Sequence, residues 1–335
     1  MEFLSQLNPR RYRKSGYIAI GALIGVLAGI AVSLFRYMIG FVLEQVVGVY
    51  LFLREQPQWI PAWILFSIVM GLILGQIVKS DPDIKGSGIP QVELQLQGKM
   101  DMKWWSVCWK KFVGGAISIG SGLLLGREGP SIQLGASVGQ GVAETLKANR
   151  VQKNVFISSG AGAGLAAAFN APIAGLMFVL EEVHHTFSPL VAVTTLTAAI
   201  VANFISLNIF GTHASLNLGN DQRFPINYYG YVVLLGIILA IFGLAYHRLT
   251  LALPTIYKKL FPKVAPYNYC IIAFMLIIPL GMWNPHVLGG GGELVLALVK
   301  ENHTVQFLIG LFVIRFVYSM ISYGTGLPGG IFLPI

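Results

Sequence analysis

Long apolar runs separated by short polar segments dominate this sequence. The first run extends from Tyr17 to about Leu34, and seven more follow at about 60–78, 105–125, 155–180, 189–210, 229–253, 268–283 and 305–323. Several are interrupted by Gly or Pro short of the ~20 residues that an unbroken membrane-spanning helix needs. The first run is not a signal peptide, because no small-residue cleavage site precedes a soluble domain and further spans follow. The pattern predicts an all-α polytopic membrane protein with partly broken helices.

The composition fits a membrane protein and excludes other classes. Hydrophobic residues make up 55% of the 335 residues and charged residues only 11%, whereas a soluble domain carries roughly 25% charged residues. An ordinary soluble enzyme is therefore excluded. The 39 glycines fit close helix packing and interrupted helices in lipid. The two cysteines, Cys108 and Cys270, cannot form a disulfide framework or a thiolate metal site.

The net charge of +9 arises from short basic clusters between the apolar runs, at 10–14, 147–153 and 258–263. Short loops rich in Lys and Arg are typical of the cytoplasmic side of membrane proteins. No basic stripe alternates with aromatic residues in a soluble segment, so nucleic acid is not an expected partner. The lipid bilayer is an expected partner, and the compact loops favour a multi-pass protein of a bacterial plasma membrane.

The second half of the sequence repeats part of the first half at a constant offset of 204 residues. Identical residues at this offset include the pairs Phe112/Phe316, Ile117/Ile321, Ser118/Ser322, Gly126/Gly330 and Pro130/Pro334. The gapless register, with apolar and serine identities beside the glycines, favours a duplication. Duplicated halves with interrupted helices are typical of transporters whose substrate site lies between the halves.

The repeat divides the chain into three expected parts. These are a cytoplasmic N-terminal segment at 1–16, a first membrane repeat at 17–212 and a second membrane repeat at 228–335. The first copy continues well beyond Pro130, whereas the sequence ends one residue after Pro334. We therefore expect the second repeat to be incomplete.

Three segments combine glycine with a proline where a helix would begin: Gly86–Pro90, Gly126–Pro130 and Gly330–Pro334. Pro is tolerated in the first turn of a helix, where a backbone N–H would have no partner. Helix N-termini at membrane depth present unpaired N–H groups and partial positive charge. Three of them together would hold a dehydrated anion without a Lys or Arg side chain, and weakly enough to release it. The expected substrate is therefore an anion.

These three segments, in this order and spacing, resemble the signature motifs of the CLC family of chloride channels and chloride/proton exchangers. The stretch Gly164–Gly175, followed by Glu181 and Glu182, is similar to that family as well. The resemblance extends from about residue 15 to the end of the chain. It implies an inverted repeat of broken and tilted helices. The fluoride-exporting branch of the family departs from the Gly-Ser-Gly-Ile-Pro pattern that is intact here.

The resemblance also implies a chloride site. Ser87 matches the family serine whose hydroxyl coordinates the central chloride, although a serine at a helix start can equally be a cap only. Ile331 and Phe332 match positions whose backbone N–H groups bind the same ion. The backbone of four further residues completes the expected site: Gly86, Arg127, Glu128 and Gly129. The family's tyrosine ligand near the end of the second repeat has no assignable counterpart in these 335 residues.

Two glutamates are the expected proton carriers. Glu128 matches the family's gating glutamate. The physical argument agrees: a carboxylate at a helix N-terminus can occupy an anion site as a tethered competitor and leave on protonation. An ion pair with Arg127 is the structural alternative, although adjacent helical residues point apart. Glu182 lies in an apolar context and matches the internal proton-transfer glutamate of the exchangers, with an interfacial salt bridge as its alternative. Glu181 is expected to pair with a neighbouring cation.

The remaining charged residues near the motifs are expected to be structural. Glu93 and Lys111 match family positions of mainly structural interest, and we expect each to be paired. Glu181 and His185 could share one helical face beside His184, but two ligands do not make a metal site. No metal and no cofactor is expected; chloride and protons are the transported ions.

The sequence thus predicts a chloride/proton antiporter with two identical subunits, each with its own pathway. A passive chloride channel of the same fold is the alternative, which would need no internal proton donor such as Glu182. An intramembrane hydrolase using Ser158 or Ser159 is not expected, because no His lies in the middle of an apolar run to act as its base.

Overall fold

The computed structural model describes residues 14–212, 225–300 and 303–332, and within these ranges the chain is helical apart from connecting turns and one isolated bridge. The helices are α2 (Lys14–Glu55), α3 (Ile60–Ser80), α4 (Ile89–Leu96), α5 (Trp104–Gly120), α6 (Glu128–Thr145), α7 (Arg150–Phe169), α8 (Pro172–Phe178), α9 (Pro189–Phe210), α10 (Tyr229–Leu260), α11 (Cys270–Trp283), α12 (Gly292–Lys300) and α13 (Val305–Gly324). A π-helical turn, η3 (Val179–Val183), follows α8.

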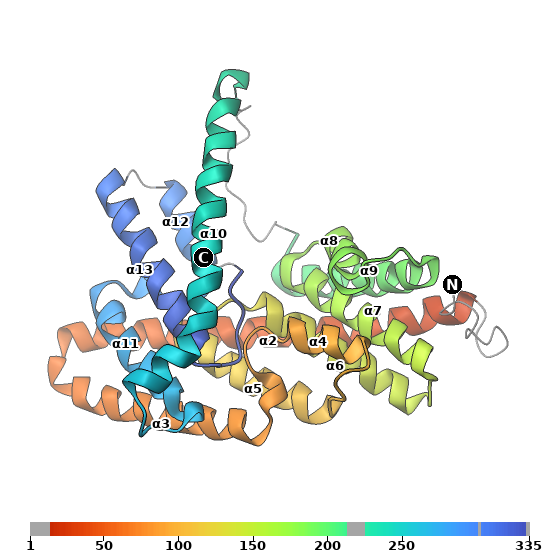
Figure 1. Ribbon diagram of the computed structural model, residues 1–335, viewed down its shortest axis with the longest axis horizontal. Coiled ribbons are helices and arrows are strands. Elements are labelled where there is room, and N and C mark those ends of the chain that lie inside the picture. Colours follow the sequence, from red (N-terminus) through yellow and green to blue (C-terminus); the bar gives the residue numbers. More distant parts are fainter. Residues whose placement is uncertain (1–13, 213–224, 301–302, 333–335) are drawn as a thin grey trace.

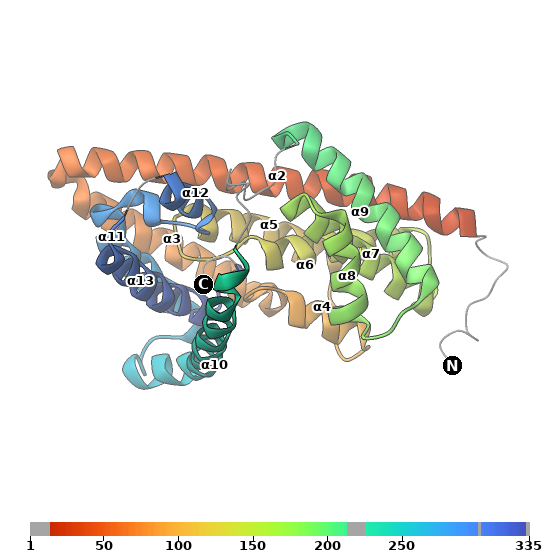
Figure 2. The same cartoon turned by 90° about the horizontal axis from the view of Figure 1, so that it is seen from above.

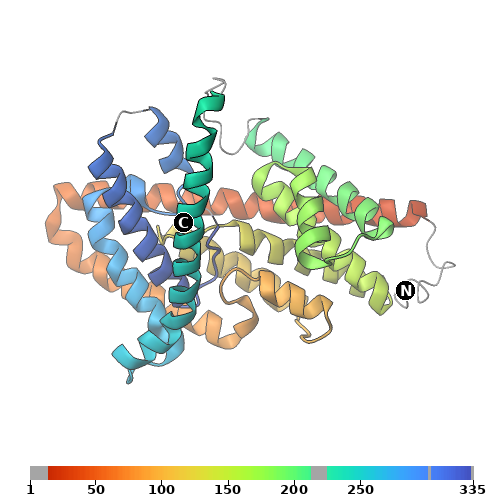
Figure 3. The ribbon, with the colours of Figure 1, turned by 45° about the horizontal axis from the view of Figure 1, so that its top comes forward.

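Among the residues that the structure describes, six helical segments are long and apolar enough to cross a membrane: 15–55, 57–80, 189–210, 226–260, 266–283 and 305–324. The prediction of an all-α polytopic membrane protein is therefore confirmed. Helix α2 runs along the length of the molecule, with α7 and α9 packed against its first half and α3 and α11 at its other end (Figures 1 and 2). Helix α10 lies beside α13 (Figure 3), and none of its most apolar stretch is buried.

Proline and glycine set most helix boundaries, as the sequence predicts. Pro lies in the first turn of α3, α4, α8 and α9, where its missing N–H has no cost. The apolar run at 189–210 coincides with α9, but α2 continues from Leu34 to Glu55. Hydropathy alone misses α6, because it buries polar side chains such as Ser131, Gln133 and Gln140 among its neighbours.

Glycine faces let several helices approach closely. On α2, Gly21, Gly25 and Gly29 recur every four residues against α9. A Cβ atom on these glycines would lie 2.7, 2.5 and 2.9 Å from backbone atoms of Thr194, Ala198 and Ala202, respectively. Such spacing of small residues is a common way for helices to pack in lipid, where van der Waals contact drives association. Helices α6 and α7 cross on a similar glycine face.

The two halves of the chain meet at equivalent positions of the sequence repeat. Gly126 and Gly330 form an isolated antiparallel bridge, with N···O distances of 2.7 and 2.6 Å for its two hydrogen bonds. Gly329 N–H also donates to the carbonyl of Gly86 at 3.0 Å, and Gly289 N–H donates to the carbonyl of Gly122 at 2.9 Å. The glycine-rich loops of both halves are therefore bonded to each other directly through the backbone.

Candidate functional site

Helix α6 begins at Glu128, in the middle of the second Gly/Pro segment. The Glu128 side chain is 4% exposed, and neither carboxylate oxygen makes a hydrogen bond of ordinary geometry with the described residues. The carboxylate lies close to the backbone N–H groups of Arg127 and Glu128 and within electrostatic reach of the Arg127 and Arg36 side chains. A buried carboxylate without a fixed partner is free to change its position, which a structural ion pair would prevent.

The loop that carries Ser87 packs against the first turn of α6. A Cβ atom on Gly129 would lie 2.6 Å from the Cβ atom of Ser87, so only glycine permits this approach. Ser87 is 8% exposed, and its hydroxyl accepts a long hydrogen bond, 3.4 Å, from the N–H of Ile89. The flanking Gly86 and Gly88 have φ angles of +59° and +90°, which other residues rarely adopt. The N-termini of α4 and α6 therefore lie side by side.

A buried lysine holds this loop in place. Lys111 on α5 is completely buried, and its ammonium group donates to the carbonyls of Ile84 at 2.9 Å and Gly86 at 2.7 Å. The expectation that Lys111 is paired is thus met by carbonyl groups. Its equivalent in the repeat, Arg315 on α13, donates to the carbonyls of Val287 at 2.7 Å and Gly289 at 3.4 Å.

The third Gly/Pro segment, Gly330–Pro334, reaches the start of α6 through Gly330. A Cβ atom on Gly330 would lie 3.3 Å from the backbone nitrogen of Gly129 and 3.3 Å from the carbonyl oxygen of Gly126. Ile331 is half-buried, and Phe332 is exposed with its ring centroid 5.8 Å from that of Phe169. The expected helix start at Pro334 lies outside the described residues.

A cavity of about 230 Å³ opens beside the α6 N-terminus. Arg127 and Glu128 line one side of it, and Gly290, Gly291 and Gly292 at the start of α12 line another. The cavity thus lies beside the place where the glycine-rich segments meet.

Besides Lys111, Arg36 on α2 supplies a buried positive charge near this cavity. Its guanidinium donates to the hydroxyl of Ser206 at 2.7 Å and to the side chain of Asn170 at 3.2 Å. Its central carbon lies 4.1 Å from the centroid of the Phe210 ring. Because Arg36 is within electrostatic reach of Glu128, it contributes to the positive potential around the start of α6 without contacting Glu128 directly. Sequence analysis missed this residue.

Glu182 lies away from this cluster, on the η3 turn after α8. Glu181 and Glu182 are both exposed, and neither forms an ion pair with the part of the chain that the structure describes. The expected pairing of Glu181 with a cation is therefore absent among these residues. Glu93 on α4 is within electrostatic reach of Glu182 and His185. Burial, and then the charge of Glu182, raises the pKa of the Glu93 carboxyl above its usual range.

One expectation about the serines of α7 is wrong. His184 does reach Ser158, with Nε2 2.7 Å from the serine Oγ. The histidine lies after the π turn rather than in an apolar run, so the pattern of apolar runs does not indicate a base near Ser158. Ser158 is nevertheless 0% exposed and its hydroxyl bonds to the Asn154 carbonyl at 2.8 Å, so no substrate could reach it as a nucleophile. The hydrolase remains excluded.

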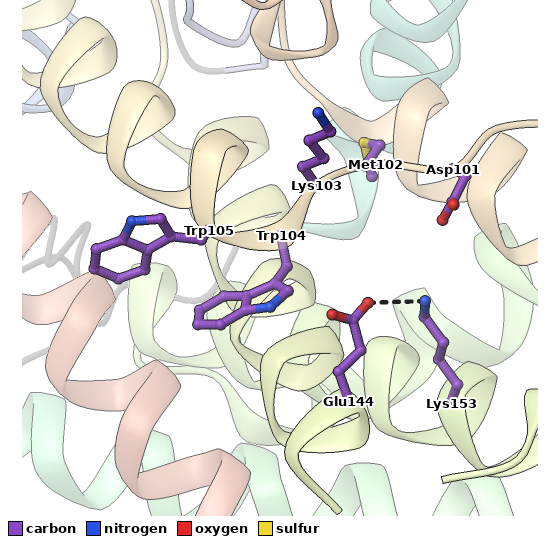
Figure 4. A pocket seen from close by; sticks show the side chains of 7 residues that line it. All are labelled: Asp101, Met102, Lys103, Trp104, Trp105, Glu144 and Lys153. Carbon is purple, nitrogen blue, oxygen red and sulfur yellow. Dashed lines mark hydrogen bonds and ion pairs between the residues drawn. The ribbon is translucent and has the colours of Figure 1, made fainter. Parts of the chain in front are cut away.

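A larger cavity of about 290 Å³ lies elsewhere, between the start of α5 and the end of α6 (Figure 4). Its lining includes Asp101, Lys103 and Trp104, together with an ion pair between Glu144 and Lys153 at 3.0 Å. It contains none of the expected ion ligands and is separate from the site above. No three metal-ligating side chains gather within residues 14–212, 225–300 and 303–332.

Comparison with known proteins identifies relatives over almost the entire chain. The family model described as voltage gated chloride channel matches residues 66–335. The H(+)/Cl(-) exchange transporter ClcA of Vibrio cholerae is 30% identical over 329 residues, which cover 94% of this chain and 69% of the relative. The protein of the same name from Vibrio vulnificus is 32% identical over 329 residues, with the same coverage.

Solved structures show the same fold. A slow cyanobacterial Cl-/H+ antiporter superimposes with a TM-score of 0.86 at 31% identity, over 95% of this chain and 76% of that one. A CLC-type fluoride/proton antiporter superimposes with a TM-score of 0.75 at 23% identity, over 96% of this chain and 78% of that one. At that lower identity the second likeness concerns the fold alone.

Proposed function

The chain belongs to the voltage-gated chloride channel family, the CLC family, and from this premise we propose that it is a chloride/proton antiporter. The relatives from both Vibrio species are named H(+)/Cl(-) exchange transporters, and the structure with a TM-score of 0.86 is named a Cl-/H+ antiporter. These names favour exchange over passive conduction. The protein is a multi-pass membrane protein, and its bacterial relatives support a bacterial plasma membrane as its location.

The observation that carries this proposal is the buried carboxylate of Glu128 at the start of α6. When ionised, it competes with chloride for the N–H groups and partial positive charge of the helix N-terminus. When protonated, it no longer gains this stabilisation, and it leaves the position to chloride. One side chain thereby makes the occupancy by chloride depend on the occupancy by a proton.

Chloride takes its ligands from the segments that meet beside Glu128. The Ser87 hydroxyl is a neutral donor, and the backbone of Gly86 and Gly129 lies next to it. The backbone of Arg127, Glu128, Ile331 and Phe332 completes the proposed set. The cavity lined by Arg127 and the α12 glycines leads chloride to this place from one side.

Glu182 is the proposed entry point for protons, on a proton pathway that differs from the chloride pathway. Its exposure lets it exchange protons with water, which a buried salt bridge would not allow. A passive channel has no need for such a group. A homodimer in which each subunit has its own pathway is also part of this proposal.

Flux measurements on reconstituted liposomes test the exchange. A chloride gradient should drive protons uphill, recorded as a change in external pH while chloride efflux is followed by an electrode. Glu128→Ala and Glu182→Gln should each lower proton flux by about a hundredfold or more, the usual cost of removing a proton-transfer group, while chloride flux continues.

Glu181→Gln is the matched control, because this neighbouring carboxylate is equally exposed on the same turn and should retain coupling. Chloride efflux without proton movement in the unmodified protein would contradict antiport and favour the passive channel. Full coupling in Glu182→Gln would remove Glu182 from the proton pathway.

A further inference from the structure

The turn that carries Glu182 is fastened to α7 through the side chain of His184. The π-helical turn η3 closes with a hydrogen bond from the His184 N–H to the Val179 carbonyl, 3.0 Å, five residues back. His184 Nε2 then lies 2.7 Å from the Oγ atom of Ser158, which is fully buried in α7. Turns of the π type are rare and occur frequently at functional sites.

The hydrogen-bond pattern defines which group donates. The Ser158 hydroxyl has one proton, and the carbonyl of Asn154 lies 2.8 Å from its oxygen as an acceptor. The imidazole must therefore donate its Nε2 proton to the serine oxygen. Burial, and then the neighbouring charge of His185, lowers the pKa of His184, so the neutral ring predominates near pH 7. The contact is a fixed hydrogen bond between two neutral groups.

Beside this anchor, Val179 and Val183 pack into the protein and the Thr186 hydroxyl donates to the His184 carbonyl at 3.2 Å, but polar side-chain contacts are few. Glu182 is exposed, and no hydrogen bond or ion pair joins its side chain to the described part of the chain. His185, which follows the anchor, has a φ angle of +52°, in the left-handed region that costs a non-glycine residue of order 1 kcal/mol. Val183 is buried, but it contributes only packing. The His184–Ser158 hydrogen bond is therefore the side-chain hydrogen bond that ties the residues next to Glu182 to α7.

The neighbours of Glu182 show why its direction matters. Glu93 on α4 is within electrostatic reach of both Glu182 and His185. Helix α4 is the helix whose N-terminal loop carries Ser87. A loosened π turn would change the distance between the Glu182 carboxylate and Glu93, which lies on the helix that leads to the proposed chloride site.

We propose that His184, bonded to Ser158, is a positioning residue for proton transfer: it holds the π turn so that the exposed Glu182 carboxylate stays within electrostatic reach of Glu93. This inference rests on the proposed function, because it gives a role to a neighbour of the proposed proton carrier. The chloride path uses none of these residues. Loss of the bond should therefore slow protons without slowing chloride.

The test compares His184→Phe and Ser158→Ala with the unmodified protein in liposomes, with proton and chloride fluxes recorded together. Loss of one hydrogen bond between neutral groups should lower the initial proton flux about fivefold while chloride flux stays within the error of the unmodified protein. His184→Gln, whose amide can still donate to Ser158, should restore part of the coupling. The double variant should be no worse than either single variant, since both remove the same bond.

His185→Phe serves as the control on the same turn, because His185 is exposed and does not contact Ser158. Unchanged coupling in His184→Phe, or an equal loss of chloride and proton flux, would overturn the inference. A different result would contradict the proposed role of Glu182: proton and chloride fluxes that remain coupled in Glu182→Gln. If Glu182→Gln uncouples and His184→Phe does not, only the positioning role is wrong.

Discussion

At the scale of single residues, buried cations without carboxylate partners stand out near the proposed site. Lys111 and Arg315 occupy equivalent positions of the repeat, and each donates to two carbonyls of a glycine-rich loop. Carbonyl oxygens satisfy the donors, but they leave the positive charge uncancelled. These residues therefore combine two effects: they fix the loops that precede α4 and α12, and they add positive potential for an anion.

Replacing Lys111 should therefore affect both stability and chloride affinity. Lys111→Met removes the hydrogen bond to the buried Ile84 carbonyl and leaves the Gly86 carbonyl with the Gly329 N–H alone, at a cost of about 1–3 kcal/mol. It also loosens the loop that carries Ser87, so we expect weaker chloride binding. The melting temperature in detergent and isothermal titration with chloride would measure the two effects.

Lys110→Met is the neighbouring control. Lys110 forms an ion pair with Asp81 at 3.5 Å and bonds to the Ser80 carbonyl at 3.4 Å, so its bonds go to the end of α3 and not to the loop that carries Ser87. It should keep its chloride affinity. Equal losses in both variants would show that the Lys111 contacts do not fix the loop.

At the scale of helices, glycine faces determine how closely the elements pack. In the α6–α7 crossing, a Cβ atom on Gly135 or Gly160 would overlap the carbonyl oxygen of the other residue, and one on Gly164 would overlap that of Ser131. In contrast, Gly230, Gly236 and Gly243 on α10 have no atom within 4 Å of such a Cβ. The same residue type thus has two different roles in one chain.

Alanine substitutions should separate these two roles. Gly160→Ala forces α6 and α7 apart and should destabilise the protein by about 1–3 kcal/mol, as overpacking does. Gly236→Ala meets no neighbour within the protein and should be neutral or stabilise α10 by roughly 0.5–1 kcal/mol. Thermal unfolding in detergent compares them directly, and a larger loss for Gly236→Ala would contradict the packing argument.

The sequence predicts helix breaks better than it predicts helix lengths. Pro90 and the glycines around Ser87 and Glu128 show where helices begin, because these residue types have few other uses at membrane depth. The extension of α2 to Glu55 and the length of α6 beyond its first turn depend on tertiary contacts, which hydropathy does not contain. The His184–Ser158 bond joins residues 26 positions apart across a π turn, and no local pattern indicates it.

At the scale of the whole molecule, the two halves of the chain are connected by the backbone bridge between Gly126 and Gly330. The constant offset of 204 predicts that equivalent residues have equivalent surroundings, and the Lys111 and Arg315 contacts agree with this. It does not predict that Gly126 and Gly330 pair with each other. That pairing requires the two copies to face one another, which is a property of their orientation and not of their sequences.

The assembly of two subunits is the prediction that belongs to this scale. We expect a homodimer with independent pathways, which mass measurement of the detergent-solubilised protein would detect. Mixed dimers with one Glu182→Gln subunit, purified through two different affinity tags, should have half the proton flux of the unmodified dimer. A flux near zero would contradict independent pathways, and a monomeric mass would contradict the dimer.

The bridge between Gly126 and Gly330 also has a consequence for biosynthesis. The ribosome makes Gly126 204 residues before its partner, so at ~5–20 residues per second roughly 10–40 s pass before the pair can form. During this interval the N–H and C=O groups of Gly126 must bond to water or to another polar partner, because hydrocarbon offers none. The proposed anion site therefore cannot be completed until the second half has been made, and the polar groups of Gly126 need a polar partner until then.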